Sequence, residues 1–179
     1  MAKIGIFFGT DTGNTRKIAK AIAKALGDDA ADPVNIAKAS PDDLLAFDSL
    51  ILASPTLGDG ELPGVPAGGE NESWAEFMDK LKEAAPDFTG KTIALVGLGD
   101  QEGYPDNFVD AIGIIYKRFS KLGASFVGEW PTDGYEYKKS KAEVDGKFVG
   151  LVLDQDNQKD QTDDRLAKWL EQVKPALLK

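Results

Sequence analysis

The sequence predicts a doubly wound α/β fold, in which one five-stranded parallel sheet with strand order 2-1-3-4-5 carries helices on both faces. Short apolar runs rich in β-branched residues alternate along the chain with amphipathic helical segments. The apolar runs lack the polar residue at every second position that a solvent-facing strand would show, which is typical of strands buried on both faces. Because ligands of such sheets bind at the carboxyl ends of the strands, we expect a site at that edge.

Five segments are predicted to form the strands, and they span residues 3–9, 33–36, 49–54, 91–97 and 124–128. The second of these is the weakest. The last strand is predicted to be interrupted, because residues 148–153 also have β character. Residues 131–147 between the two β segments are polar and rich in turn formers. We therefore expect an insertion in strand five that forms an excursion outside the loops at the site.

Helices are predicted between the strands, at residues 15–26, 74–82, 107–122 and 162–178. In the first of them Ile18, Ile22 and Leu26 fall on one face and the lysines fall elsewhere, which is the pattern of a helix packed against a sheet. No internal repeat, low-complexity tract or linker interrupts the series. Residues 1–179 are therefore expected to form a single domain.

The composition restricts the chemistry. The chain has no cysteine and no histidine, which excludes disulfides, thiolate nucleophiles, iron–sulfur ligation, most zinc sites and the commonest catalytic base. No metal site is expected. Redox chemistry in such a chain must come from a bound organic cofactor.

The charge and the hydropathy pattern limit the kinds of partner that the protein can bind. The formal net charge of -9 opposes binding to nucleic acid or to an anionic membrane and favours a positively charged partner surface, although it also serves solubility alone. No apolar run approaches the roughly 20 residues that span a bilayer, and no signal-peptide pattern precedes the first strand. We expect a cytoplasmic protein.

The segment after the first strand has the composition of a phosphate-binding loop. Backbone N–H groups and hydroxyls converge there on a helix N-terminus. The segment has neither the lysine of a P-loop nor the spacing of a dinucleotide fold, which indicates a terminal monophosphate held by neutral donors. The alternative is that its threonines and asparagine only cap the helix. Its residues are Gly9, Thr10, Asp11, Thr12, Gly13, Asn14 and Thr15.

Two further loops follow the third and fourth predicted strands, at residues 54–62 and 97–107. Both should open on the same edge as the phosphate loop. The three loops together resemble the FMN-binding loops of flavodoxins, in the right order and each after a predicted strand. The residues that carry the resemblance are Thr10-x-Thr12-Gly13-x-Thr15, Pro55-Thr56-x-Gly58-Asp59-Gly60-Glu61 and Gly99-Asp100-Gln101-x-Gly103-Tyr104.

The resemblance implies a set of cofactor-binding residues. The phosphate would be held by the first loop, with Asp11 contributing backbone only. Tyr104 would stack on the exposed face of the flavin, and Leu57 would provide aliphatic contact where many flavodoxins have tryptophan. The set is Thr10, Asp11, Thr12, Gly13, Asn14, Thr15, Pro55, Thr56, Leu57, Gly58, Asp59, Gly60, Gly99, Asp100, Tyr104, Asn107 and Asp156.

Some of these roles remain open between alternatives. By the resemblance, Asp100 would bond the pyrimidine edge of the ring and Asn107 would lie beside it. Either Asp154 or Asp156 would approach the ribityl chain, and for both acids a solvated surface charge or a helix cap is an equally good interpretation.

Three segments narrow the resemblance further. Residues 131–147 resemble the insertion of long-chain flavodoxins, and residues 154–158 with 162–165 resemble their C-terminal part. Residues 70–74 resemble the subgroup that delivers electrons to nitrogenase. The implied function is a monomeric, low-potential, one-electron carrier with non-covalent FMN, which shuttles electrons between a reductase and an acceptor, with nitrogenase reductase as one acceptor. Its partners would carry basic docking surfaces.

Two alternatives belong to other classes. A flavin-dependent reductase of small substrates would need an acid–base pair or a nicotinamide fingerprint, and the sequence shows neither. A phosphorylated receiver-domain switch would need an aspartate at the end of strand three, where this chain has Ser54 and Pro55, and an acidic pair where it has Gly9 and Thr10.

Overall fold

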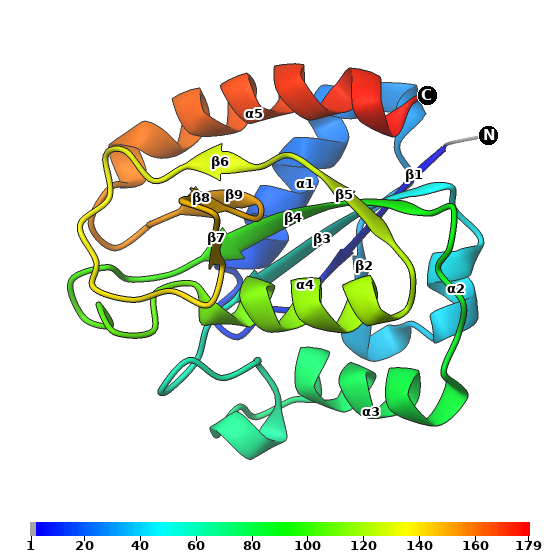
Figure 1. Ribbon diagram of the computed structural model, residues 1–179, viewed down its shortest axis with the longest axis horizontal. Coiled ribbons are helices and arrows are strands. Elements are labelled where there is room, and N and C mark those ends of the chain that lie inside the picture. Colours follow the sequence, from blue (N-terminus) through cyan, green and yellow to red (C-terminus); the bar gives the residue numbers. More distant parts are fainter. Residues whose placement is uncertain (1–2) are drawn as a thin grey trace.

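A parallel sheet forms the centre of the molecule. The structure is a computed structural model that describes residues 3–179, and Figure 1 shows its sheet enclosed between helices. The strand order is β2-β1-β3-β4-β5, and every neighbouring pair is parallel. Both the order and the parallel pairing confirm the prediction. The strands are β1 (Ile4–Phe8), β2 (Val34–Asn35), β3 (Ser49–Pro55), β4 (Thr92–Leu98) and β5 (Ser125–Val127).

The fifth position of the sheet is shared by two short strands. β5 pairs with the first half of β4, and β9 (Leu151–Leu153) pairs in parallel with its second half. The predicted interruption of strand five is therefore confirmed. Between the two halves lies a small antiparallel sheet with the order β6-β8-β7. Its strands are β6 (Trp130–Pro131), β7 (Glu143–Val144) and β8 (Lys147–Phe148).

The inserted segment forms the predicted excursion, but it packs against the rest of the molecule. The side chain of Ala142 is fully buried, and the buried Tyr135 donates its hydroxyl to the carbonyl of Val152 at 2.5 Å. The N–H groups of residues 138 and 139 both donate to the carbonyl of Pro105, at 2.7 and 3.0 Å. The insertion lies outside the three loops, as predicted, but these bonds tie it to the third loop.

Helices cover both faces of the sheet. In Figure 1, α1 and α5 lie on one face and α3 and α4 on the other. The predicted helices are confirmed to within a few residues, and the short α2 was not predicted. Its N-terminus is closed by a capping box, in which Asp43 N–H donates to Ser40 Oγ and Ser40 N–H donates to Asp43 Oδ2. The helices are α1 (Asn14–Leu26), α2 (Pro41–Leu45), α3 (Trp74–Ala84), α4 (Asp110–Lys121) and α5 (Thr162–Leu177).

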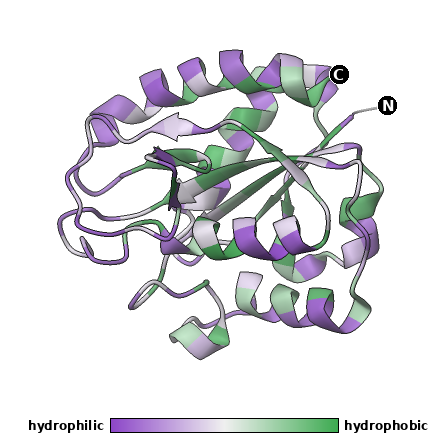
Figure 2. Ribbon diagram, viewed as in Figure 1, coloured by the Kyte–Doolittle hydropathy of each residue, from purple (hydrophilic) through white to green (hydrophobic). Residues whose placement is uncertain are grey.

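The sheet separates two apolar cores. Alternate residues of β1 point to opposite faces, so Ile6 packs with α1 and α5, whereas Phe7 packs with α2, α3 and α4. Figure 2 shows the apolar residues on the strands and on the inward faces of the helices. Burial on both faces explains why the central strands are apolar throughout, and their parallel pairing places the carboxyl ends of β1, β3 and β4 at one edge.

Within residues 3–179, no helix is long and apolar enough to cross a membrane.

Candidate functional site

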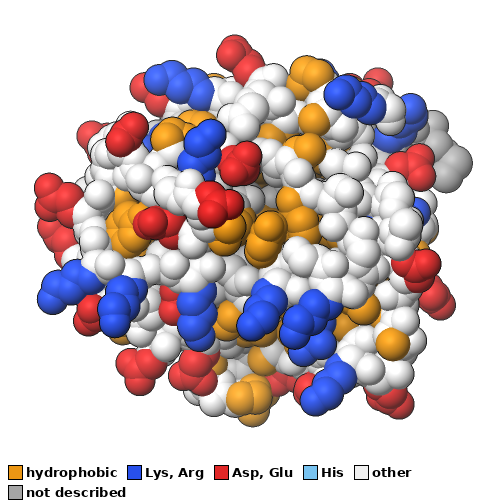
Figure 3. All heavy atoms as spheres, in the orientation of Figure 1, with side chains coloured by type: hydrophobic (Ala, Val, Ile, Leu, Met, Phe, Trp, Pro, Cys, Tyr) orange, Lys and Arg blue, Asp and Glu red, His pale blue; other side chains and the backbone are white. Residues whose placement is uncertain are grey.

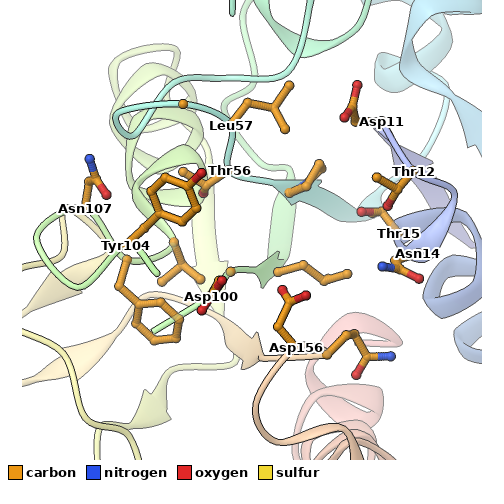
Figure 4. A pocket seen from close by; sticks show the side chains of 17 residues that line it. Asp11, Thr12, Asn14, Thr15, Thr56, Leu57, Asp100, Tyr104, Asn107 and Asp156 are labelled. Carbon is orange, nitrogen blue, oxygen red and sulfur yellow. The ribbon is translucent and has the colours of Figure 1, made fainter. Parts of the chain in front are cut away.

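A cleft of about 330 Å³ opens at the carboxyl edge of the sheet. It brings together the loops after β1, β3 and β4 and the turn after β9, as Figure 4 shows. The sequence-predicted residues that line it are Asp11, Thr12, Asn14, Thr15, Pro55, Thr56, Leu57, Gly58, Gly99, Asp100, Tyr104, Asn107 and Asp156. Four others, Thr10, Gly13, Asp59 and Gly60, do not line the cleft.

One end of the cleft is formed by the N-terminus of α1. Gly13 caps this helix at a φ of 93°, a left-handed conformation that favours glycine, and the cap has no side-chain hydrogen bond. Its first turn contains no acidic residue, and first-turn N–H groups have no acceptor within a helix. The hydroxyl of Thr10 accepts the N–H of Gly13 at 2.9 Å, which fixes the loop from outside the cleft. This end is suited to an anion.

An antiparallel backbone bridge between Leu57 and Glu61 closes the loop after β3. Leu57 N–H donates to Glu61 O at 2.9 Å, and Glu61 N–H donates to Leu57 O at 2.7 Å. Gly58 and Gly60 make the turn possible, with φ values of 49° and 89°. Asp59 is exposed at the tip, and Gly60 is buried below it. The bridge leaves the side chain of Leu57 at the wall of the cleft.

The loop after β4 carries the aromatic wall. The side chain of Tyr104 is 50% exposed, and its N–H donates to Asp100 O at 2.9 Å. Asp100 Oδ1 accepts the N–H groups of Glu102 and Gly103 at 3.1 and 2.8 Å, so this carboxylate shapes the loop as well as lining the cleft. Figure 4 shows Tyr104 and Asn107 at the end of the cleft opposite to Thr12 and Asn14.

Two neighbouring aspartates have opposite environments. Asp154 is buried, and although burial raises the pKa of its carboxyl, hydrogen bonds from Asn157 and Gln101 outweigh this effect and lower the pKa. Asp156 lines the cleft, where burial first and then repulsion from Asp100 and Asp154 raise its pKa. Of the two alternatives left open by the sequence, only Asp156 lies at the cleft, and Asp154 is an internal anchor.

Four residues that line the cleft were missed from the sequence: Leu98, Phe108, Val109 and Gln155. Leu98 ends β4, and Gln155 precedes Asp156, so their positions beside predicted residues were an available signal. Val109 has a φ of 50°, which is rare for a β-branched residue, and no sequence pattern indicates it. This conformation places Val109 at the wall of the cleft just before α4.

The lining of the cleft fits one kind of ligand. Threonine hydroxyls and free N–H groups occupy one end, and Leu57, Tyr104 and Phe108 provide apolar and aromatic surface toward the other. Carboxylates of Asp100 and Asp156 lie between them (Figure 4). A phosphate-ended ligand with a flat ring system and a polar linker matches this order.

Comparison with known proteins finds relatives that match almost the whole chain. The sequence model of the family described as "Flavodoxin" matches residues 6–169. A flavodoxin of Klebsiella pneumoniae is 57% identical over 178 residues, covering 99% of this chain and all of the relative. A flavodoxin of Enterobacter agglomerans is 51% identical over 179 residues, again covering 99% of this chain and all of the relative.

A solved structure extends the similarity to three dimensions. The flavodoxin of Fusobacterium nucleatum bound to flavin mononucleotide superposes with a TM-score of 0.86 at 34% identity. The match covers 98% of this chain and 99% of that one.

Proposed function

The chain belongs to the flavodoxin family, an electron-transfer family, and from that premise we propose that it binds one FMN in the cleft and carries single electrons at low potential in the cytoplasm. The observation that carries the proposal is the order of the cleft lining, with phosphate-type donors at one end and a tyrosine with a leucine toward the other. Together these groups match the two ends of FMN. FMN supplies the chemistry, because a flavin exchanges electrons one at a time.

Each loop has a separate task in this proposal. Thr12, Asn14 and Thr15 hold the phosphate with the free N–H groups of α1, while Thr10 and Gly13 keep the loop in shape. Tyr104 stacks on the exposed face of the ring, and Leu57 contacts the inner face. Asp156 bonds the ribityl chain, and its pKa is raised first by burial and then by the neighbouring carboxylates.

The carboxylates around the cleft determine whether the reduction potential of a bound flavin is raised or lowered. Asp11, Asp100 and Asp156 line it, and the exposed Asp59 stands beside it. Added negative charge on a bound group is opposed by these neighbours in a partly desolvated site. We therefore infer that the protein lowers the reduction potential for the second electron of the bound flavin.

The acidic rim also indicates the partners. Glu70 and Glu72 line hollows that border Thr10 and Asp11, next to the phosphate end of the cleft, and the hollow at Glu72 also contains Arg16 and Lys38. Such a rim attracts a basic surface. We propose that a reductase and an acceptor with basic docking surfaces use it in turn, with nitrogenase reductase as the acceptor because residues 70–74 resemble that subgroup. The protein acts as a monomer of one domain.

The test of the proposal is a comparison of FMN with riboflavin. The apoprotein should bind one FMN and prefer it over riboflavin by at least about tenfold, since the α1 end of the cleft serves the phosphate alone. Thr12→Ala with Asn14→Ala should reduce this preference, and Thr89→Ala, an exposed threonine outside the cleft, should not. Equal affinity of the unaltered protein for both flavins would refute the phosphate site.

A further inference from the structure

A second hollow, of about 840 Å³, lies along α4 and is separate from the cleft. Its apolar surface comes from Ile114 and Tyr116 of α4 and from Val144 of β7, which is 37% exposed. No residue that lines it is acidic. We call this hollow the α4 groove.

The rim of the α4 groove is basic in a protein whose net charge is -9. It carries four cations, Lys117, Arg118, Lys121 and Lys141. Figure 3 shows Lys and Arg side chains in a row across the face that α4 occupies in Figure 1. Within residues 3–179 the one ion pair joins Lys174 to Asp29, so no rim cation forms an ion pair with a carboxylate of these residues, although the charge of Lys141 acts on the nearby carboxyl of Asp110.

The two walls of the groove are held together by close backbone packing. A Cβ atom on Gly113 would lie 2.4 Å from the carbonyl oxygen of Lys141, so only glycine lets α4 approach the inserted segment this closely. Lys141 N–H donates to Asp110 Oδ1 at 2.7 Å, and Ser140 Oγ donates to Phe108 O at 2.5 Å. The groove is therefore a preformed feature, and binding to it would not have to order its walls.

Charge decides between classes of ligand for this groove. A long polyanion such as nucleic acid would meet the repulsion of the whole acidic molecule. None of the residues that line the groove is acidic, and within the described part of the chain no cluster of metal-binding side chains occurs, so nothing there favours a cationic ligand. A short acidic segment of a protein, with an apolar side chain at its centre, matches both the cations of the rim and the apolar floor of the groove.

We propose that the α4 groove is a docking surface for an acidic segment of a partner protein, which places an aliphatic or aromatic side chain against Ile114 and Val144. The groove differs in sign from the acidic rim of the cleft, so the molecule presents two surfaces to partners of opposite charge. The inserted segment links them, because residues 138 and 139 donate to Pro105 beside Tyr104. The docking does not depend on the cofactor-binding proposal.

The test uses the FMN-loaded protein and a short blocked peptide in which glutamates flank a central pair of phenylalanines. Backbone amide resonances of residues 113–121 and 141–144 should shift in a saturable manner. Lys117→Glu with Lys121→Glu should weaken binding by roughly tenfold. The matched control is Lys20→Glu with Lys24→Glu, which makes the same charge change at exposed positions of α1 on the other face and should weaken binding by less than about twofold.

Four results would overturn the proposal. The first is the lack of saturable shifts along α4, and the second is an equal loss of affinity in both double variants, which would mean that net charge alone acts. The third is equal binding of a peptide with glycines in place of the phenylalanines. The fourth is tighter binding of duplex DNA or of phosphatidylserine vesicles than of the peptide. Val144→Ser should weaken binding of the phenylalanine peptide but not of the glycine peptide. This variant tests the apolar contact without a change of charge.

Discussion

Gly58 occupies the tip of the second loop in a conformation that other residues rarely adopt. Its φ is 49°, and an added Cβ would lie 2.7 Å from Glu61 Oε1. Gly58→Val should therefore cost about 1–2 kcal/mol in this loop, since a β-branched side chain disfavours the left-handed region. We expect FMN affinity, measured by flavin fluorescence, to fall about tenfold. Asp59→Ala, at the exposed tip, should change it little; full affinity in the valine variant would contradict the assignment.

Asp154 is a buried carboxylate that the fold uses in its charged form. Both of its oxygens accept hydrogen bonds, from Gln101, Asp156 and Asn157. Because its folded pKa is lowered, its contribution to stability is present above the unfolded pKa and is lost as the pH falls through the folded value. Asp154→Asn should lower the free energy of unfolding by about 2 kcal/mol at neutral pH.

The pH dependence separates this role from a general loss of packing. The stability gap between the unaltered protein and Asp154→Asn should shrink as the pH falls below the ordinary aspartate pKa of about 4. Denaturant titrations at several pH values measure the gap. The control is Asp156→Asn, which should not lower stability at neutral pH because the pKa of Asp156 is raised instead. A gap that stays constant with pH would show that the charge of Asp154 is not what stabilises the fold.

Among the elements, the inserted segment has a structural task at the site. Tyr135 accepts the indole N–H of Trp130 at 3.0 Å and donates to Val152 O, and it stacks under the guanidinium of Arg165. Burial is the main cause that raises the pKa of Tyr135 to about 12, so its hydroxyl stays a donor throughout the ordinary pH range. The segment thus joins β9 to the third loop.

Removal of that hydroxyl tests the role of the insertion. Tyr135→Phe should lower the free energy of unfolding by about 1–2 kcal/mol, because Val152 O and the Trp130 N–H lose their partner. Tyr137→Phe is the matched control, since the hydroxyl of Tyr137 donates to the exposed Glu143 and its loss should cost less. Equal stability of the two variants in urea would show that the insertion does not brace the loop.

The elements also show where sequence reasoning succeeds and where it stops. β1, β3 and β4 are apolar along their whole length, so local pattern alone predicted them and the three loops that follow. The burial of Tyr135 and Ala142 depends on residues distant in the sequence, so the polar pattern around them predicted an excursion but not its packing. The left-handed conformation of Val109 is imposed by packing and has no sequence signal. The sequence therefore predicted which loops form the site, whereas the structure was needed to identify all the residues that line it.

At the scale of the whole molecule, one sheet serves two cores and one site. Both apolar clusters contain residues of β1, β3 and β4, so loss of either core would remove support from the same strands. The carboxyl edge of this sheet holds the cleft with its acidic rim, whereas α4 on one face carries the basic groove. In our two proposals, the cleft edge is where basic partners dock and the α4 groove on the side face is where an acidic partner docks.

The measurement that tests the central claim most directly is a stepwise electron titration of the FMN-loaded protein at one pH. The account predicts two resolved one-electron potentials, with the second well below that of free FMN because Asp100, Asp156 and their acidic neighbours oppose added negative charge. A single two-electron step at the potential of free FMN would contradict it, because a protein that leaves its flavin unperturbed cannot act as a low-potential carrier of single electrons.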